Sequence, residues 1–113
     1  MKILVKTLPF LLLLGIILAC NTVSKQQLQN VKVGDKLVYR YQKDGKEWMY
    51  VDKITRIEGD KIYYVPGKME ATSKNELSLD NFVTDKEGSI TKDELMKYDQ
   101  ETGDDHKVII EIR

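Results

Sequence analysis

Residues 44–65, DGKEWMYVDKITRIEGDKIYYV, combine two tight-turn signals with long runs of strand-forming side chains. Asp44-Gly45 is a strong signal for a two-residue hairpin turn, and Gly59-Asp60 marks a second turn. Around these turns the β-branched and aromatic residues recur with the period of two that a half-buried strand requires. The segment therefore predicts the centre of an antiparallel sheet, with strands before, between and after the two turns.

Further strands are predicted on both sides of this segment. The alternation that precedes the first turn involves Leu37, Tyr39 and Tyr41. The apolar residues that indicate a fourth strand, after the stop signal Pro66-Gly67, are Leu77, Leu79 and Phe82. A last strand is expected at residues 107–113, KVIIEIR.

The apolar positions between the two turns change phase around Asp52-Lys53, which indicates a bulge or a sharp bend of the kind that small barrels use at their corners. About eighty residues form this part of the chain, enough for one small core and too few for two domains. We expect a mainly β domain over residues 31–113. It would be a small antiparallel β-barrel or a strongly bent meander of about five strands, with one short helix near the C-terminus.

Residues 44–65 resemble the central hairpins of Src-homology-type and Tudor-like small β-barrels. Those hairpins have an aromatic residue early in one strand, a tight turn and a β-branched partner strand. The resemblance implies an architecture and no activity, because such folds host many unrelated functions.

The N-terminus has the composition of a secretory signal peptide. Lys2 and Lys6 precede or flank the start of an apolar run over residues 8–19, which is shorter than the roughly 20 residues of a bilayer-spanning helix. A basic start followed by a short apolar run with a small residue at its end is typical of a cleaved signal peptide. We therefore expect residues 1–19 to be removed from the mature protein.

The end of this run, Ile17-Leu18-Ala19-Cys20, resembles the lipobox of bacterial lipoprotein precursors. Leu18 is bulkier than the small residue most often found at that place, whereas Ala19 and Cys20 fit well. The resemblance implies cleavage before Cys20, a lipid on its sulfur and usually a fatty acid such as palmitate on the new amine. Two or more acyl chains anchor a protein stably. The mature protein is thus expected at the cell membrane, facing the periplasm or the exterior.

Residues 20–30 are expected to be the lipidated cysteine and a flexible tether, because the segment is polar and offers almost nothing to bury. In enterobacterial lipoproteins an aspartate directly after the cysteine favours retention at the inner membrane, and this chain has Asn21 there. The outer membrane is therefore favoured if the cell has two membranes.

The charge balance argues against a nucleic-acid partner. The precursor carries 18 basic and 18 acidic side chains. Removal of residues 1–19 takes away Lys2 and Lys6 and no acidic residue, which leaves 16 basic against 18 acidic side chains. Nucleic-acid binding depends on clustered positive charge, which this composition does not supply.

Thr91 and Glu94 fit a capping box, in which each side chain satisfies a free backbone amide at the start of a helix. Ile90 and Leu95 fit the hydrophobic staple that accompanies such a box. A helix is therefore expected from residue 92 to about residue 100.

The same region also fits a degenerate EF-hand-like calcium loop, whose acidic ligands would be Asp85, Glu87 and Glu94. The first place of such a loop supplies a main ligand, and Val83 holds that place here without an oxygen to offer. We therefore prefer a polar turn over residues 85–88, and calcium binding is the alternative.

No catalytic constellation is recognised in the sequence. His106 is the single histidine and Cys20 the single cysteine, so a hydrolytic triad cannot be assembled once the thiol is lipidated. The sequence marks none of its many carboxylates as lying in an apolar setting that would change its pKa. We predict that the protein is not an enzyme and uses no cofactor and no metal.

Aromatic side chains are concentrated in the first three predicted strands, as Tyr39, Tyr41, Trp48, Tyr50, Tyr63 and Tyr64. Adjacent strand residues point to opposite faces, so some of these rings must lie at the surface, where Tyr and Trp favour binding patches. We expect Trp48 in the core and Tyr41, Tyr63 and Tyr64 as candidate partner contacts. In the alternative, the outward rings simply cover the sheet between Lys and Arg side chains.

These features together suggest a membrane-anchored bacterial lipoprotein that acts as a non-catalytic binding or scaffolding module in the cell envelope. Its partners would be the membrane, through the lipid on Cys20, and an envelope protein, peptide or glycan. An immunity- or inhibitor-like lipoprotein belongs to the same class. The alternative is a calcium-binding structural lipoprotein that uses Asp85, Glu87 and Glu94.

Overall fold

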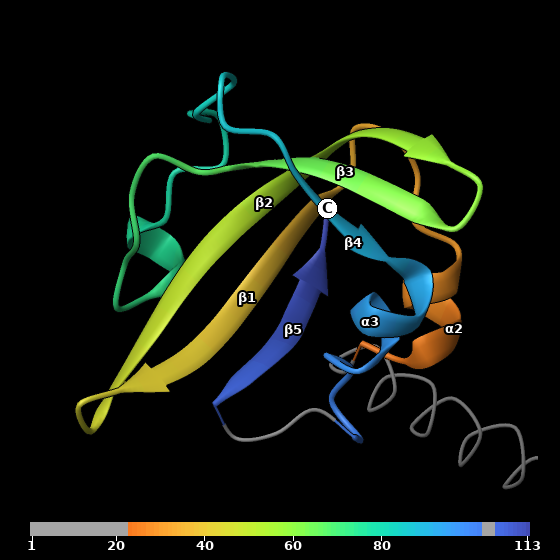
Figure 1. Ribbon diagram of the computed structural model, residues 1–113. Helices are drawn as coiled ribbons and strands as arrows, with labels where there is room; N and C mark the ends of the chain where they lie inside the picture. The colour runs from red at the N-terminus through yellow and green to blue at the C-terminus, as the bar shows by residue number, and fades with distance from the viewer. Residues whose placement is uncertain (1–22, 103–105) are drawn as a thin grey trace, which may run out of the picture.

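Five antiparallel strands form one sheet in the order β4-β3-β2-β1-β5 (Figure 1). The computed structural model describes residues 23–102 and 106–113 of the chain. The strands are β1 (Lys36–Lys43), β2 (Lys46–Glu58), β3 (Lys61–Pro66), β4 (Gly88–Thr91) and β5 (Lys107–Ile112). The short helical segments are α2 (Lys25–Gln29), η1 (Lys74–Glu76) and α3 (Lys92–Met96). The mainly β fold with five antiparallel strands is confirmed. Within the described residues β4 and β5 are the two edges of an open sheet, so a closed barrel is not confirmed.

The hairpin between β1 and β2 has the predicted two-residue turn. Lys43 and Lys46 are paired, which leaves Asp44 and Gly45 as the turn residues. Both have positive φ angles, 54° and 74°, as a turn that follows the twist of the strands requires. Gly has no Cβ to clash in this conformation, and Asp tolerates it better than most residues do. The turn thus fixes the register of the hairpin.

β2 bends, but beyond the predicted point. The register of β2 against β3 shifts between Ile54 and Arg56. Asp52 and Ile54 are both buried and share one parity, so the phase change predicted at Asp52-Lys53 is wrong in position. Because Asp52 is polar but buried, the sequence pattern suggested a change of face at a position where there is none. The shift lets both Ile54 and Ile57 pack on the same core.

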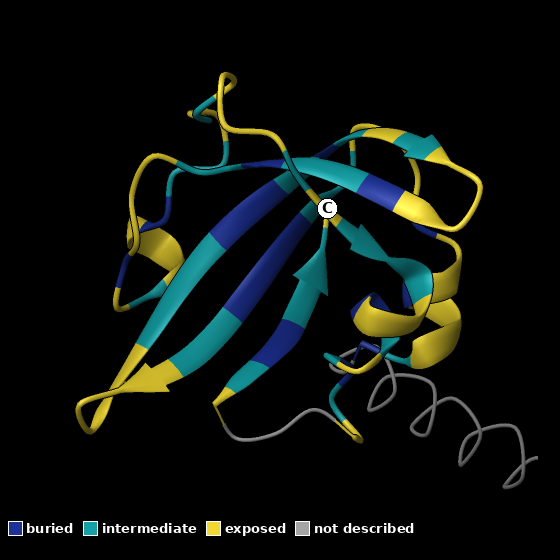
Figure 2. Ribbon diagram, viewed as in Figure 1, coloured by how far each residue is buried: buried dark blue, intermediate teal, exposed yellow. Residues whose placement is uncertain are grey.

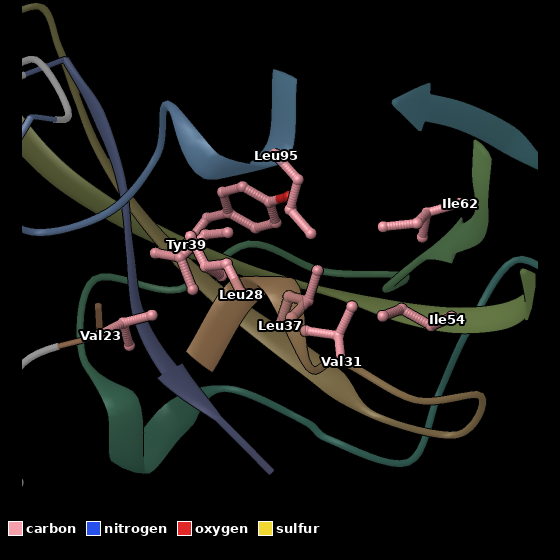
Figure 3. Packing of buried hydrophobic residues seen from close by; sticks show 9 residues of the cluster. Val23, Leu28, Val31, Leu37, Tyr39, Ile54, Ile62 and Leu95 are labelled. Carbon is pink, nitrogen blue, oxygen red and sulfur yellow. The ribbon is translucent and has the colours of Figure 1, made fainter. Parts of the chain in front are cut away.

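The larger core lies between the sheet and the helices α2 and α3 (Figure 3). Its buried members are Val23, Leu28, Val31, Leu37, Tyr39, Ile54, Ile62, Leu95 and Ile109. α2 contributes Leu28 and α3 contributes Leu95, and neither side chain has exposed surface. Helices this short are not stable alone, so their burial against the sheet holds them in place.

The opposite face of the sheet carries a smaller core. Val38 and Val51, which are partners across β1 and β2, pack with Ala71 and Leu77 from the long connection between β3 and β4. Figure 2 shows buried positions along the middle of β1 and β2 and exposed ones at the turn between them. Both faces of the sheet are therefore covered, by α2 and α3 on one side and by the connection with η1 on the other.

The predicted flexible tether is wrong from Val23 onward, and the folded domain begins earlier than residue 31. Ser24 caps α2 through a capping box with Gln27, and Leu28 is fully buried. The carbonyl group of Val23 accepts a hydrogen bond from the backbone of Gln100 at 3.1 Å. Two apolar residues in a polar segment are enough, because α3 supplies the surface that buries them.

The predicted fourth strand is also wrong. Leu77 and Leu79 lie in the β3–β4 connection, and Phe82 forms only an isolated bridge with Gly67. Their apolar character serves the smaller core, on which Leu77 is buried. The fourth strand is β4, whose four residues are too few to show an alternation.

The capping box of Thr91 and Glu94 is confirmed at the start of α3. The helix ends at Met96, four residues before the predicted end. Asp99 accepts hydrogen bonds from both the backbone N–H and the hydroxyl of Thr102. Such local side-chain bonds offer the backbone an alternative to the helix and favour a turn.

Candidate functional site

Aromatic rings form a row on the face of the sheet that α2 and α3 cover. Tyr39 and Tyr50 are partners across β1 and β2, and their rings are stacked with centroids 4.7 Å apart. Tyr41 meets Tyr50 edge-on at 5.6 Å. Tyr98, which follows α3, meets Tyr39 edge-on at 5.9 Å. Trp48 is the partner of Tyr41, so the row extends from the larger core toward the β1–β2 turn.

Lys107, the first residue of β5, places its ammonium group over three of these rings. The Nζ atom lies 4.8 Å from the ring centroid of Tyr98, 5.0 Å from that of Tyr39 and 5.5 Å from that of Tyr50. Ring faces attract a cation, most strongly where water is excluded. Partial burial lowers the pKa of Lys107, and Asp52 opposes that change.

Asp52 is the buried acid of this cluster, with 6% of its surface exposed. Burial raises the pKa of its carboxyl group to about 7, against the opposing charge of Lys107. Burial and the Asp52 charge together also raise the pKa of Tyr64. The sequence prediction missed this acid. Asp52 has the same parity along β2 as Tyr50 and Ile54, and this parity is the signal in the sequence that could have placed it in the core.

A surface hollow of about 460 Å³ opens beside the row. Its lining consists of Tyr41, Gln42, Tyr50, Glu70, His106 and Lys107, and we call it the tyrosine hollow. Burial and a hydrogen bond donated to Glu70 raise the pKa of Tyr41 to about 12. His106 lies in the turn before β5, at the edge of this hollow. The hollow thus offers two partly exposed rings and a rim of groups that form hydrogen bonds.

A second hollow, of about 410 Å³, shares Lys107 with the tyrosine hollow. It is lined by Glu94, Lys97, Tyr98, Thr102 and Lys107. Its lining is mostly charged, and one carboxylate oxygen of Glu94 already accepts bonds from the backbone N–H and the hydroxyl of Thr91. The tyrosine hollow is therefore the more suitable surface for a partner with apolar parts.

The three predicted contact residues do not form one patch. Tyr41 lines the tyrosine hollow. Tyr64 packs on β4, where a Cβ atom at Gly88 would come within 2.9 Å of its ring. Tyr63 lies under the guanidinium group of Arg56, whose Cζ atom is 3.7 Å from the ring centroid. Tyr63 therefore fits the alternative in which outward rings are covered by long basic side chains.

Trp48 does not lie in the core, so that prediction is wrong. Its side chain is partly exposed near the β1–β2 turn and belongs to neither core cluster. The Nζ atom of Lys46 lies 5.8 Å from the centroid of its ring. The ring of the row that is buried in the larger core is Tyr39, and Tyr50 packs against that core.

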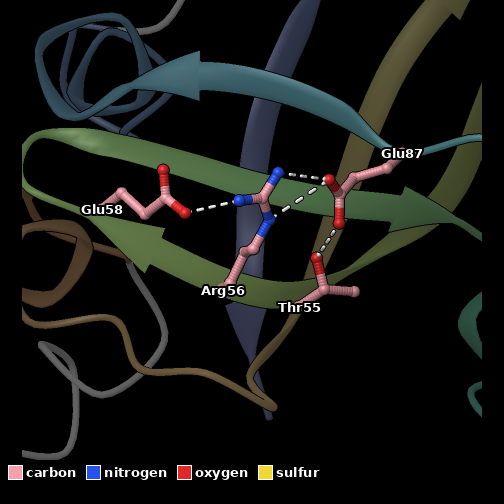
Figure 4. A network of polar contacts seen from close by, with 4 residues as sticks. All are labelled: Thr55, Arg56, Glu58 and Glu87. Carbon is pink, nitrogen blue, oxygen red and sulfur yellow. Dashed lines mark hydrogen bonds and ion pairs between the residues drawn. The ribbon is translucent and has the colours of Figure 1, made fainter.

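Two of the three acidic residues of the calcium alternative, Glu87 and Glu94, are engaged in separate places, and Asp85 is exposed in a turn. Glu87 accepts hydrogen bonds from Arg56 and Thr55, and Arg56 also pairs with Glu58 (Figure 4). These bonds lower the pKa of Glu87. Glu94 closes the capping box. Over residues 23–102 and 106–113, no three His, Cys, Asp or Glu side chains gather as a metal-binding group.

Cys20 lies outside the described residues, as do the signal peptide and the first part of the tether. None of the helices in the described part is long and apolar enough to cross a bilayer. The lipidation of Cys20 therefore stays a prediction from the sequence.

Comparison with known proteins gives no match: no family model fits the sequence, and neither a curated protein nor a solved structure is significantly similar to it.

Proposed function

We propose that the chain is a membrane-anchored lipoprotein that acts as a non-catalytic binding or scaffolding module of the cell envelope. The lipobox-like residues 17–20 support the anchor. The tyrosine hollow supports the binding role, because it is the place where partly exposed rings and polar groups meet. The partner would be an envelope protein, peptide or glycan, and an immunity- or inhibitor-like role is one form of this function.

The observation that carries the proposal is the way in which the ring row pre-organises the hollow. Tyr50 is held against Tyr39, and Tyr41 is held both by Tyr50 and by Glu70. Rings that are already fixed lose little conformational freedom when a partner binds. Large rings in a central position can dominate the binding energy of an interface. His106 and Gln42 add hydrogen-bonding groups at the rim.

A non-catalytic role suits the two unusual titratable groups of the site. Asp52 is buried and Lys107 lies against three rings, and the charge of each reduces the electrostatic cost of burying the charge of the other. Their arrangement supports the larger core at least as well as it would support chemistry on a substrate. We also propose that the architecture is similar to that of small β-barrels. The bent β2 and the pairing of β5 with β1 support this likeness.

Affinity capture from native membranes with the full-length protein tests the binding role. Tyr41→Ala should abolish capture, because it removes a ring that lines the hollow. Tyr63→Ala is the matched control, since it removes a partly exposed tyrosine that lies elsewhere, under Arg56. Capture that survives Tyr41→Ala, in a variant that melts like the wild type, would remove the hollow as the contact surface.

Metabolic labelling with a fatty acid tests the anchor. The wild-type protein should take up the label, and Cys20→Ser should remain an unlabelled precursor that is not cleaved before residue 20. Label that persists on Cys20→Ser would rule out the lipobox assignment.

A further inference from the structure

The folded domain starts three residues after Cys20. Val23 is buried in the larger core, and its carbonyl group is bound to the backbone of Gln100. Ser24 then caps α2, and Leu28 fastens this helix to the sheet and α3. From Val23 onward the chain is therefore part of the domain and adds nothing to the length of a tether.

We propose that the side of the domain bearing α2 and the neighbouring segment 98–102 lies against the phospholipid bilayer, with η1 on the side that points away. This orientation rests on the proposed function, because it requires a lipid on Cys20. Three residues of extended chain reach at most about 11 Å, whereas a free tether over residues 20–30 would reach about 40 Å. The longer tether would allow any orientation, and the shorter one does not.

The thickness of the domain makes this difference decisive. η1 directly precedes Leu77, which belongs to the smaller core on the face of the sheet opposite to Val23 and α2. One helix layer and the sheet together separate the two sides by on the order of 20 Å. A link of about 11 Å therefore cannot bring η1 to the membrane without unfolding the segment that begins at Val23.

The surface near Val23 does not supply an electrostatic reason for this orientation. Lys25 and Glu101 are exposed there with opposite charges, and Gln26 and Gln100 are neutral. Exposed charges that balance give little net attraction, and salt screens what remains. The length of the link would thus set the orientation, and raising the ionic strength should leave it unchanged.

The tyrosine hollow lies on the face of the sheet that α2 covers, but toward the other end of the strands. The β1–β2 turn lies at the end of the sheet away from α2 and α3 (Figure 1). Tyr41 and Gln42, near the end of β1, bring the hollow toward this free end. The hollow is therefore displaced along the strands from the part of the domain that the short link holds at the bilayer.

Fluorescence quenching of the full-length lipidated protein in vesicles tests the orientation. Gln26→Cys on α2 and Asn75→Cys on η1 are exposed sites for a thiol-reactive fluorophore, and the vesicles contain a lipid with a quencher on its headgroup. Quenching should be several-fold stronger at position 26 than at position 75, both without salt and with about 0.5 M salt. That salt concentration reduces the Debye length to a few ångströms. Ten Gly/Ser residues inserted between Thr22 and Val23 should remove the difference, because such a linker spans about 20 Å.

Fatty-acid labelling and a melting curve of each preparation separate the possible results. Acylated, folded protein that is quenched equally at both positions would overturn the orientation and leave the proposed function intact. Protein that takes up no fatty acid and does not associate with vesicles would overturn both. Stronger quenching at position 26 that disappears with the inserted linker is the result we expect.

Discussion

The rings of Tyr39 and Tyr50 lie parallel, with 4° between their planes and 4.7 Å between their centroids. Tyr39 is 4% exposed and belongs to the larger core, whereas Tyr50 is partly exposed and lines the tyrosine hollow. This single cross-strand pair thus connects the part of the molecule that stabilises the fold with the part that we propose for binding.

The stacked pair should show a measurable coupling. Tyr39→Ala should lower the free energy of unfolding by about 3–5 kcal/mol, as large buried rings do. Tyr50→Ala should cost less, because its ring is only partly buried. In a double-mutant cycle by urea unfolding, the pair should couple by about 0.5–1.5 kcal/mol. Strict additivity of the two changes would show that the stacking contributes nothing beyond burial.

The centre of the sheet was predictable because its signals are local. Asp44-Gly45 selects a two-residue turn by its own backbone preferences, and the alternation on both sides then follows from the pleat. Thr91 and Glu94 are equally local, since a capping box needs only residues three apart. Each of these features required no knowledge of the remainder of the chain.

The features that the sequence prediction missed depend on contacts between distant segments. Leu28 is buried because α3 packs on it, and Leu77 is buried because a loop crosses the sheet. The pKa of Asp52 is set by burial in a core that β5 and Tyr98 help to close. From the sequence alone, an acidic residue within a strand is predicted to lie at the surface, because the distant segments that bury it are not apparent from its neighbours in the sequence.

Gly88→Ala should destabilise the edge of the sheet. A Cβ atom at this position would lie 2.9 Å from the ring and hydroxyl of Tyr64, so the ring would have to move. We expect a loss of about 1–3 kcal/mol in the free energy of unfolding, measured by thermal or urea unfolding. Adding Tyr64→Ala should make Gly88→Ala nearly neutral. A loss of the same size in both backgrounds would place its cause elsewhere in β4.

Trp48→Ala should fold and lose part of its binding. The ring is partly exposed and stands outside both core clusters, so we expect a cost of about 1–2 kcal/mol, below the 3–5 kcal/mol of a buried ring. Its strand partner is Tyr41, and it should therefore support the edge of the tyrosine hollow. Melting temperature and capture efficiency are measured on the same variant. A loss of about 3–5 kcal/mol in the free energy of unfolding would indicate that Trp48 is part of the core.

Asp52→Asn should change how stability depends on pH. The carboxyl pKa rises on folding from 3.8 to about 7, so the folded state holds this proton more tightly than the unfolded state does. The resulting stabilisation is complete below pH 3.8 and is lost as the pH rises through about 7. Relative to the wild type, Asp52→Asn should therefore gain on the order of 2–4 kcal/mol in unfolding free energy between pH 4 and pH 8. The matched control is Asp85→Asn in an exposed turn, which should keep the wild-type profile. Parallel stability profiles for all three proteins would contradict a buried carboxyl group with a raised pKa at position 52.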